Sequence, residues 1–381
     1  MKIHVWVPDY ASAIGGIQTF SRFLVRGLRD VFPDAHISVF SKNDTSYPDA
    51  RSDPADKFVP SGWWHRYLRT ASFAETLFRA AVSERPDFII TSHVNFAPVA
   101  HWLQKSVRVP YAAVGHGVEV WEVRSQPVSM ALRAANVLLA VSGFTRRRMA
   151  AALGIEEERI SILPNTFDPE QFYPQPKPHY LLKRYGLKPS QPVILTIARL
   201  ASAERYKGYD QILRALPILR SQYPNVRYVL GGRGPDKPRV ERLIRESGVS
   251  DNVILAGYVT DYELRSHYNL CDVFVMPSKG EGFGIVFLEA LACAKPVLAG
   301  NKDGSVDAVL NGELGALVDP DSVSEIATEL QNIINRSQQS GGSEANKQRR
   351  ARVIEAYGYD RFRAKLEAVL APLVRTVEAR S

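Results

Sequence analysis

The sequence predicts an α/β protein made of two doubly wound domains, each a parallel sheet with helices on both faces. The chain has 381 residues, of which 45% are hydrophobic and 23% charged, enough for two cores of ordinary domain size. Short apolar runs alternate with amphipathic stretches along the whole chain, which favours parallel sheets covered on both faces. Four prolines in twelve residues, within 168–179, divide these runs into two series.

Each series predicts five buried strands. The first five are Ile3–Val7, Ala35–Phe40, Asp87–Thr91, Tyr111–Val114 and Val137–Val141; the second five are Val193–Ala198, Arg227–Leu230, Val253–Ala256, Val273–Met276 and Pro296–Ala299. Helical periodicity is clear at Gln18–Arg29, Tyr209–Tyr223 and Phe287–Cys293. In open sheets of this kind ligands bind at the carboxyl ends of the strands, so we look for functional residues there.

Proline interrupts both helix and strand, so we expect a linker at residues 169–190. It separates an N-terminal domain, residues 1–168, from a second domain, residues 191–357. Ser337–Ser343 (SQQSGGS) reads as a second flexible stretch, and residues 344–381 read as helical and basic. We expect residues 358–381 to form a helical tail that packs back on the N-terminal domain.

Composition and motifs exclude several classes of protein. Cys271 and Cys293 form no CxxC pair and lie in apolar stretches, so we expect core thiols in a reduced compartment. The N-terminal apolar run is too short for a signal peptide, and no window reaches the ~18–20 apolar residues of a spanning helix; we expect a cytoplasmic protein. The net charge of +8 is too dilute to indicate nucleic acid, but it suits anionic membranes or phosphorylated ligands. HExxH, GxxxxGK[ST] and GxSxG motifs are absent.

The strongest local signal is a glycine-rich turn, Ser278–Gly284, between a predicted strand and a predicted helix. Free backbone N–H groups at a helix N-terminus suit a phosphate. Glu281 falls in the turn, where its carboxylate can accept hydrogen bonds from sugar hydroxyls, and we expect it to have no partner in the core. Glu289 follows about two helical turns later, on roughly the same side.

Arg199 follows the strand Val193–Ala198, and Lys207-Gly208 opens the next helix. An arginine fork and a lysine point charge are the usual pairing for a diphosphate. Taken alone, these residues could equally be solvated loop charges. Beside the Glu281 turn we interpret them as ligand-binding.

Two features of the first half also follow predicted strands. Gly15-Gly16 allows close approach of the backbone to a ligand, and is equally compatible with a plain turn. His116 lies in a Gly-His-Gly turn and is a candidate for polar catalytic work. Gly231–Pro235 lacks the third glycine of a dinucleotide fingerprint and is weak evidence for NAD.

At these residues the sequence resembles the family-4 retaining glycosyltransferases (glycosyl transferase group 1), whose GT-B fold has two Rossmann-like domains facing each other across a cleft. The matching pieces are Glu281 with Glu289 (E-x7-E), Arg199 with Lys207-Gly208, Gly231–Pro235, Leu163-Pro-Asn165 and Gly15-Gly16. Asn165 and Ser142 match looser positions of the family. The resemblance covers nearly the whole chain.

The resemblance implies a hexosyltransferase that uses a UDP- or GDP-sugar, with no other cofactor, in polysaccharide or glycoconjugate biosynthesis. It assigns Arg199 and Lys207 to the diphosphate, Glu281 to the donor-sugar hydroxyls and Glu289 to the ribose. His116 would lie beside the transferred sugar. The expected catalytic residues are therefore His116, Glu281, Arg199 and Lys207, and the expected donor-binding residues are Gly15, Gly16, Arg199, Lys207, Glu281, Gly282, Phe283, Gly284 and Glu289.

Transfer would need no metal. Arg199, Lys207 and the amides of the Glu281–Gly284 turn can stabilise the leaving diphosphate, and the Asp-x-Asp sequence Asp319-Pro-Asp321 lies in a late turn. The resemblance favours front-face attack, in which the leaving phosphate takes the acceptor's proton. Glu281 then orients the sugar and is not the nucleophile.

Two stretches depart from the family pattern. The loop after Pro296–Ala299 has Asp303 and Asp307 where the family often has the first Gly and the Glu of Gly-Gly-x-x-Glu. A charged insert, Glu204-Arg205-Tyr206, precedes Lys207. Both departures could alter the choice of sugar or acceptor.

The acceptor is expected to be a glycan or lipid-linked saccharide. Trp63, Trp64, Arg66 and Arg69 form an aromatic and basic segment that continues through Phe73, Leu77 and Phe78. It suits a membrane interface, or equally a core-packing helix with a solvated basic face. Because many relatives extend lipid-linked glycans, we favour peripheral docking at the cytoplasmic face of a membrane. Alternative functions are a sugar-nucleotide epimerase, a glycan phosphorylase or a non-catalytic nucleotide-sugar-binding protein.

Overall fold

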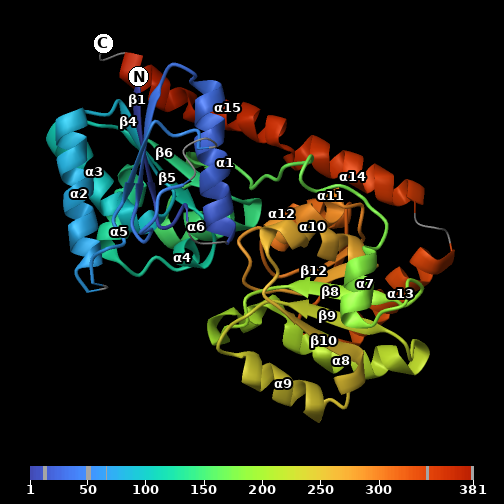
Figure 1. Cartoon of the computed structure of the whole chain (residues 1–381). Coiled ribbons are helices and arrows are strands. Elements are labelled where there is room, and N and C mark those ends of the chain that lie inside the picture. Colours follow the sequence, from blue (N-terminus) through green and yellow to red (C-terminus); the bar gives the residue numbers. More distant parts are fainter. Residues whose placement is uncertain (12–14, 49–52, 66, 340–342, 379–381) are drawn as a thin grey trace. The chain divides into compact units, whose positions relative to one another are not determined.

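A computed structural model of the chain describes residues 1–11, 15–48, 53–65, 67–339 and 343–378. The chain divides into two compact units: unit 1 is Met1–Thr166 with Asp360–Ser381, and unit 2 is Phe167–Tyr359. Each unit contains its own parallel sheet with helices on both faces (Figure 1). The predicted class, two doubly wound α/β halves, is confirmed.

Among the described residues of unit 1, seven parallel strands lie in the order β3-β2-β1-β4-β5-β6-β7. All five predicted strands are present to within one residue at each end. The edge strands β3 and β7 were not predicted: β3 ends in Pro60, a residue that argues against a strand, and β7 has only three residues. The strands are β1 Lys2–Val7, β2 His36–Ser41, β3 Lys57–Pro60, β4 Phe88–Thr91, β5 Tyr111–Gly115, β6 Val137–Ala140 and β7 Ile160–Ile162.

Helices cover both faces of this sheet (Figure 1). Buried residues of α2, α3, α5 and α6 form one core against one face. On the other face, α1 packs with the C-terminal helix α15: the rings of Phe20 and Phe362 meet edge to face with centroids 6.1 Å apart. The helices are α1 Gly16–Val31, α2 Arg69–Glu84, α3 Ala97–Val107, α4 Val118–Trp121, α5 Gln126–Ala134, α6 Gly143–Leu153 and α15 Tyr359–Glu378.

Unit 2 has six parallel strands among its described residues, in the order β10-β9-β8-β11-β12-β13. The five predicted strands are again present to within one residue, and the three-residue edge strand β13 was missed. The strands are β8 Val193–Ile197, β9 Arg227–Gly231, β10 Val253–Gly257, β11 Val273–Met276, β12 Val297–Gly300 and β13 Ala316–Val318.

In unit 2, helices α8, α9 and α13 pack on one face of the sheet. On the other face, Tyr268 of α10 and Phe287 of α11 each contact Phe274 of β11. Cys271 and Cys293 are buried free thiols, as predicted. The helices are α7 His179–Tyr185, α8 Tyr209–Gln222, α9 Lys237–Glu246, α10 Asp261–Leu270, α11 Ile285–Ala292, α12 Ser305–Ala308, α13 Val323–Gln339 and α14 Ser343–Tyr357.

The proline-rich segment runs without helix or strand up to α7 and is held on unit 2. The backbone N–H of Gln175 donates to Asn269 Oδ1 at 2.7 Å, and Lys177 Nζ donates to Asp272 Oδ2 at 2.7 Å. The C-terminal stretch is helical as predicted, in α14 and α15. Of the stretch predicted to be flexible, Ser337–Ser343, residues 340–342 lie outside the described residues, and α13 continues to Gln339.

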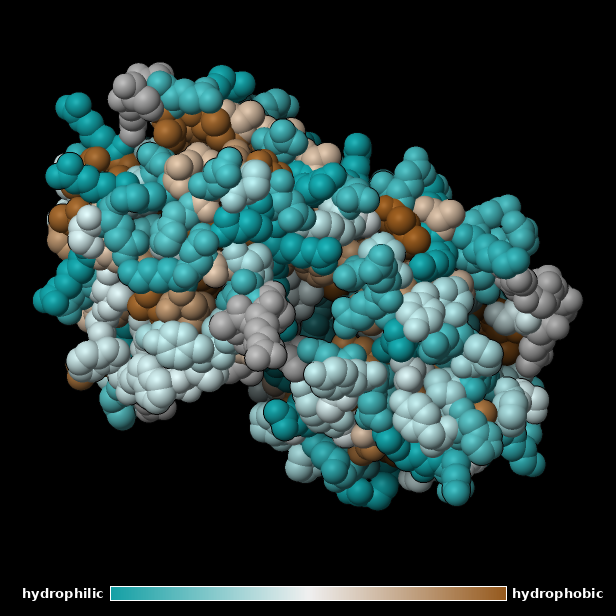
Figure 2. All heavy atoms as spheres, turned by 45° about the horizontal axis from the view of Figure 1, so that its top comes forward, coloured by the Kyte–Doolittle hydropathy of each residue, from teal (hydrophilic) through white to brown (hydrophobic). Residues whose placement is uncertain are grey.

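On the face shown in Figure 2, hydrophilic side chains predominate and hydrophobic ones form small, separate patches. Of the helices in the described parts of the chain, none is both long enough and apolar enough to cross a membrane.

Candidate functional site

The predicted cations and the predicted glycine-rich turn meet where the strand order of unit 2 reverses, between β8 and β11. These two strands pair in register, with Phe274 opposite Leu195. The segment carrying Arg199 and Lys207 leaves β8, and the segment carrying Glu281 leaves β11. This edge is where doubly wound sheets bind ligands.

Lys207 Nζ forms an ion pair with Glu281 Oε1 and lies 3.8 Å from Glu204 Oε2. The other oxygen of Glu204 lies 3.1 Å from Arg199 Nη1. Burial alone would lower the pKa of Lys207, but the carboxylate of Glu281 raises it above its ordinary value, so the amine stays charged. The predicted residues Arg199, Lys207 and Glu281 therefore lie together. The carboxylate of Glu204, which the sequence showed only as part of the charged insert, links Arg199 to Lys207.

Two glycines allow the backbone segments around this site to pack closely against each other. Gly208 has φ +81, and a Cβ there would lie 2.3 Å from the carbonyl oxygen of Pro277. Gly232 has φ +149, and a Cβ there would lie 1.8 Å from the carbonyl oxygen of Ala198. The Gly231–Pro235 segment thus packs against the chain beside Arg199, which explains its glycines without a dinucleotide.

The three residues of the insert Glu204-Arg205-Tyr206 contact three different parts of unit 2. Glu204 contacts the two cations. Arg205 turns away to Asp236, with Nη2 2.7 Å from Oδ1. Tyr206 packs against the glycine-rich turn, since a Cβ on Gly280 would lie 2.6 Å from its ring.

Asp303, noted in the sequence as a departure from the family, is buried beneath the Glu281 turn and holds it. Its Oδ2 accepts hydrogen bonds from the hydroxyl of Ser278 at 2.7 Å and the N–H of Glu281 at 2.8 Å. Its Oδ1 accepts from the N–H and hydroxyl of Ser305. Of the amides in the Glu281–Gly284 turn that the sequence predicts as donors to the leaving diphosphate, the N–H of Glu281 is therefore already engaged within the protein.

Two further expectations for Glu281 need correction. Its carboxylate is predicted to have no partner in the core, but it pairs with the mostly buried Lys207. Helical spacing predicts that it aligns with Glu289, but α11 begins only at Ile285, so Glu281 lies before the helix and the spacing does not apply to it. Gly284, with φ +96, caps this helix, and the Phe283 ring is buried against Tyr357.

Glu289 lies in the middle of α11 and is buried. The hydroxyl of Tyr268, on α10, donates to its Oε2 at 2.6 Å. Burial raises the pKa of Glu289 to about 7, and the hydrogen bond from Tyr268 opposes that rise. Tyr268 was missed because only the folded chain brings α10 beside α11.

In unit 1, His116 follows β5 in the Gly-His-Gly turn. Its Nε2 lies 2.8 Å from the carbonyl oxygen of Ser92 and donates to it, which leaves Nδ1 as the acceptor. Burial lowers the pKa of His116, so the ring is neutral near pH 7. Glu119 Oε1 accepts from the N–H groups of His116 and Gly117 and fixes the turn; the sequence reading had not selected Glu119.

The other predicted residues of unit 1 lie around helix starts and strand ends. Gly15 is the N-cap of α1, and a Cβ on Gly16 would meet no atom of the described residues within 4 Å. Ser142 caps α6 by accepting from the N–H of Thr145 at 2.9 Å. Asn165 is buried, and its Oδ1 has no hydrogen-bond partner in the part of the chain that the structure describes.

The first part of the aromatic and basic segment, with Trp63 and Trp64, lies at the surface. Trp63 is 71% exposed and Trp64 52%. Arg69 begins α2, and its Nε donates to the carbonyl oxygen of Trp64 at 3.3 Å; Arg66 lies outside the described residues. The apolar residues that do enter the core, Phe73 and Leu77, come later, on α2. The core-packing interpretation therefore holds for Phe73 and Leu77 but not for Trp63 and Trp64.

Both carboxylates of the Asp-x-Asp sequence, Asp319 and Asp321, form ion pairs with lysines. Lys302 Nζ lies 2.6 Å from Asp319 Oδ1, and Lys279 Nζ lies 2.5 Å from Asp321 Oδ1. In the described ranges, no cluster of three His, Cys, Asp or Glu side chains could hold a metal ion.

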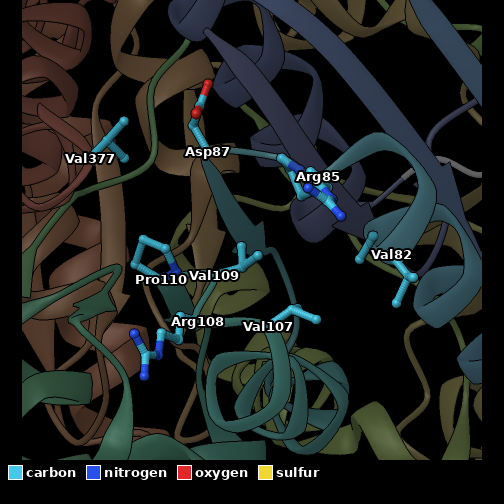
Figure 3. Close-up of a pocket in the computed structure, with 10 residues that line it drawn as sticks. Val82, Arg85, Asp87, Val107, Arg108, Val109, Pro110 and Val377 are labelled. Atoms are coloured by element: carbon cyan, nitrogen blue, oxygen red, sulfur yellow. The ribbon is translucent and has the colours of Figure 1, made fainter. Parts of the chain in front are cut away.

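An open pocket of about 450 Å³ lies at the opposite edge of the unit 1 sheet, at the amino ends of β4 and β5 (Figure 3). Arg85 and Arg108 line it together with Val82, Val107 and Val377. It contains none of the predicted site residues.

Two family models match the chain: Glycosyltransferase Family 4 over residues 14–171 and Glycosyl transferases group 1 over residues 181–355. A GDP-mannose-dependent alpha-(1-6)-phosphatidylinositol monomannoside mannosyltransferase from Mycolicibacterium smegmatis is 35% identical over 208 residues, 52% of this chain and 53% of that protein. A D-inositol 3-phosphate glycosyltransferase from Nocardiopsis dassonvillei is 30% identical over 247 residues, 62% of this chain and 57% of that protein. The chain thus spans little more than half the length of these curated relatives.

Among solved structures, a sucrose-phosphate synthase from Thermosynechococcus elongatus matches with a TM-score of 0.79 and 22% identity, over 100% of both chains. Anabaena HepE in complex with UDP matches with a TM-score of 0.77 and 20% identity, over 97% of this chain and 100% of that one. This likeness shows the fold, the GT-B architecture expected from the sequence.

Proposed function

The chain belongs to the group 1 glycosyltransferases, and on that premise we propose that it moves a hexosyl group, with retention, from a nucleotide diphosphate sugar to a hydroxyl of a glycan or lipid-linked saccharide. The observation that carries the proposal is the pairing of Lys207 with Glu281, next to Arg199, at the ligand edge of unit 2. The two cations suit a diphosphate, and the adjacent carboxylate suits sugar hydroxyls.

In the proposed reaction, negative charge grows on the leaving diphosphate as the anomeric bond breaks. Arg199 and Lys207 stabilise that charge. Glu281 orients the sugar through its hydroxyls, while the leaving phosphate takes the proton of the acceptor hydroxyl on the same face. Glu289 binds the ribose; with a pKa of about 7 its carboxyl can either donate or accept a hydrogen bond.

We assign His116 and Gly16, both in unit 1, to the sugar and the donor respectively. Because Nε2 of His116 is committed to Ser92, its Nδ1 is the atom that would accept from a sugar hydroxyl. Among the described residues of unit 1, which exclude 12–14, a Cβ on Gly16 would meet nothing within 4 Å. A glycine at this position is consistent with space kept for a ligand.

GDP-mannose is the first donor to test, since the mycobacterial relative that is 35% identical uses it. That relative acts on a phosphatidylinositol mannoside, and the exposed Trp63 and Trp64 suit a lipid surface. We therefore propose a lipid-linked acceptor reached by peripheral docking.

The test is a transfer assay with the purified chain. Radiolabelled GDP-mannose, UDP-glucose and UDP-N-acetylglucosamine are each incubated with vesicles that contain or lack phosphatidylinositol mannosides, and label in the lipid phase and free nucleoside diphosphate are both measured. We expect one donor to be used, and Glu281→Gln to abolish that turnover. Lys237→Ala, which removes an exposed lysine of the same unit, serves as the matched control.

The alternatives predict different results. A phosphorylase would show the absorbance of a pyridoxal cofactor. A non-catalytic binding protein would bind a nucleotide sugar and neither transfer nor slowly hydrolyse it. An epimerase would convert the donor without releasing nucleoside diphosphate.

A further inference from the structure

Glu204 holds the two cations that the proposed function assigns to the donor's diphosphate. One carboxylate oxygen lies 3.1 Å from Arg199 Nη1, and the other lies 3.8 Å from Lys207 Nζ. Each oxygen serves a different cation, so the carboxylate bridges them. A bridging diphosphate would use the same two partners.

The charges of this group balance. Arg199 and Lys207 contribute two positive charges, and Glu204 and Glu281 two negative ones. The side chains of Lys207, Glu204 and Glu281 are each less than one-fifth exposed, so water screens these three charges less than on an open surface. Arg199 is 63% exposed and its charge is screened more. A diphosphate that binds here competes with these carboxylates for both cations.

The two carboxylates differ in what they can do once a donor is bound. Glu281 leaves Lys207 for the sugar hydroxyls, to which the proposed reaction assigns it. Glu204 gains no such partner and remains a negative charge beside the incoming phosphates.

We propose that Glu204 is an internal counter-ion: it occupies the diphosphate-binding cations when the donor is absent, and its charge weakens the binding of nucleoside diphosphate. This inference rests on the proposed function. A weaker hold on the diphosphate speeds its release after transfer, because Glu204 returns to Arg199 and Lys207 as the product leaves.

The experiment is a calorimetric titration of GDP and UDP into wild type, Glu204→Gln, Glu204→Ala and Glu241→Gln. Glu241 is the control because it forms an exposed ion pair with Lys237 in the same unit, 3.5 Å long. We expect Glu204→Gln and Glu204→Ala to bind the preferred nucleotide at least about fivefold more tightly than wild type, since each removes one negative charge beside the phosphates. Glu241→Gln should bind like wild type.

Two Glu204 variants are used because tighter nucleotide binding should come from the loss of the negative charge. Glu204→Ala tests this without the amide that Glu204→Gln introduces. Equal or weaker binding by both folded Glu204 variants overturns the inference, because Glu204 would then support the cations rather than compete for them. Arg199→Ala and Lys207→Ala separate this failure from failure of the proposed site: if they bind GDP and UDP as wild type does, the diphosphate site itself is misplaced.

Discussion

The hydroxyl of Tyr268 donates to a carboxylate oxygen of Glu289 at 2.6 Å, and both side chains are buried. Burial raises the pKa of Glu289 from its ordinary 4.5 to about 7, although the hydrogen bond lowers it. A buried carboxyl with a pKa near neutrality links the stability of unit 2 to pH.

Replacing Glu289 by glutamine should remove this pH dependence. The folded state binds one proton more than the unfolded state between about pH 4.5 and 7, so wild-type stability falls as pH rises through that window. From about pH 5 to about pH 8, Glu289→Gln should gain roughly 2–3 kcal/mol relative to wild type. Denaturant unfolding at both pH values checks this, with the exposed Glu241→Gln as control; a constant difference at the two pH values would contradict a raised pKa.

Alanine at either donor-site cation should weaken nucleoside diphosphate binding. Each removes a charge-assisted contact worth ~1.5–3 kcal/mol. Lys207→Ala should cost more than Arg199→Ala, because the lysine side chain is 17% exposed and the arginine 63%. Calorimetry against GDP and UDP measures the loss, with Lys237→Ala unchanged. The reverse order of the two losses would show that exposure does not set the strength of these contacts.

Asp303→Asn should loosen the Glu281 turn. The carboxylate accepts four hydrogen bonds, two through each oxygen. In the asparagine variant an N–H₂ group replaces one of these oxygens and would face two hydrogen-bond donors, which it cannot satisfy. We expect a loss of about 1–3 kcal/mol in the free energy of unfolding and weaker donor binding in the variant that remains folded. The exposed Asp321→Asn is the control, and wild-type stability of Asp303→Asn would show that the turn does not depend on this carboxylate.

Transfer should persist in excess EDTA. The proposed stabilisation of the leaving group comes from Arg199 and Lys207, and lysines contact Asp319 and Asp321. The initial rate with and without chelator is the measurement. Complete loss of activity that is restored by Mg²⁺ or Mn²⁺ would overturn the metal-independent mechanism.

Binding to anionic vesicles should require Trp63 and Trp64. Both rings are more than half exposed, so they can enter the headgroup layer. Co-sedimentation with anionic and with neutral vesicles should show less bound protein for Trp63→Ala/Trp64→Ala than for wild type, and less binding at high salt. Tyr262→Ala is the control, since that ring is 96% exposed on unit 2. Equal sedimentation of the tryptophan variant and wild type would favour a soluble acceptor.

The fold was predictable because buried parallel strands are continuous apolar runs. β3 and β7 escaped because edge strands are short and partly polar. The proximity of Arg199 and Glu281 was also predictable, since both segments leave the carboxyl ends of strands. The partners of these residues were not: Asp303 under Glu281 and Tyr268 beside Glu289 are pairings between separate crossovers, which no periodicity within one segment encodes.

The return of α15 to unit 1 has a consequence for biosynthesis. α1 presents Phe20 to Phe362, and α15 also buries Leu366 and Leu370, yet these partners are separated in the chain by all of unit 2. A ribosome must therefore translate residues 167–359 before unit 1 can cover that side of α1, whereas unit 2 is complete once its own stretch has emerged. During synthesis the apolar surface of α1 that contacts α15 therefore stays exposed until the last helix has been translated.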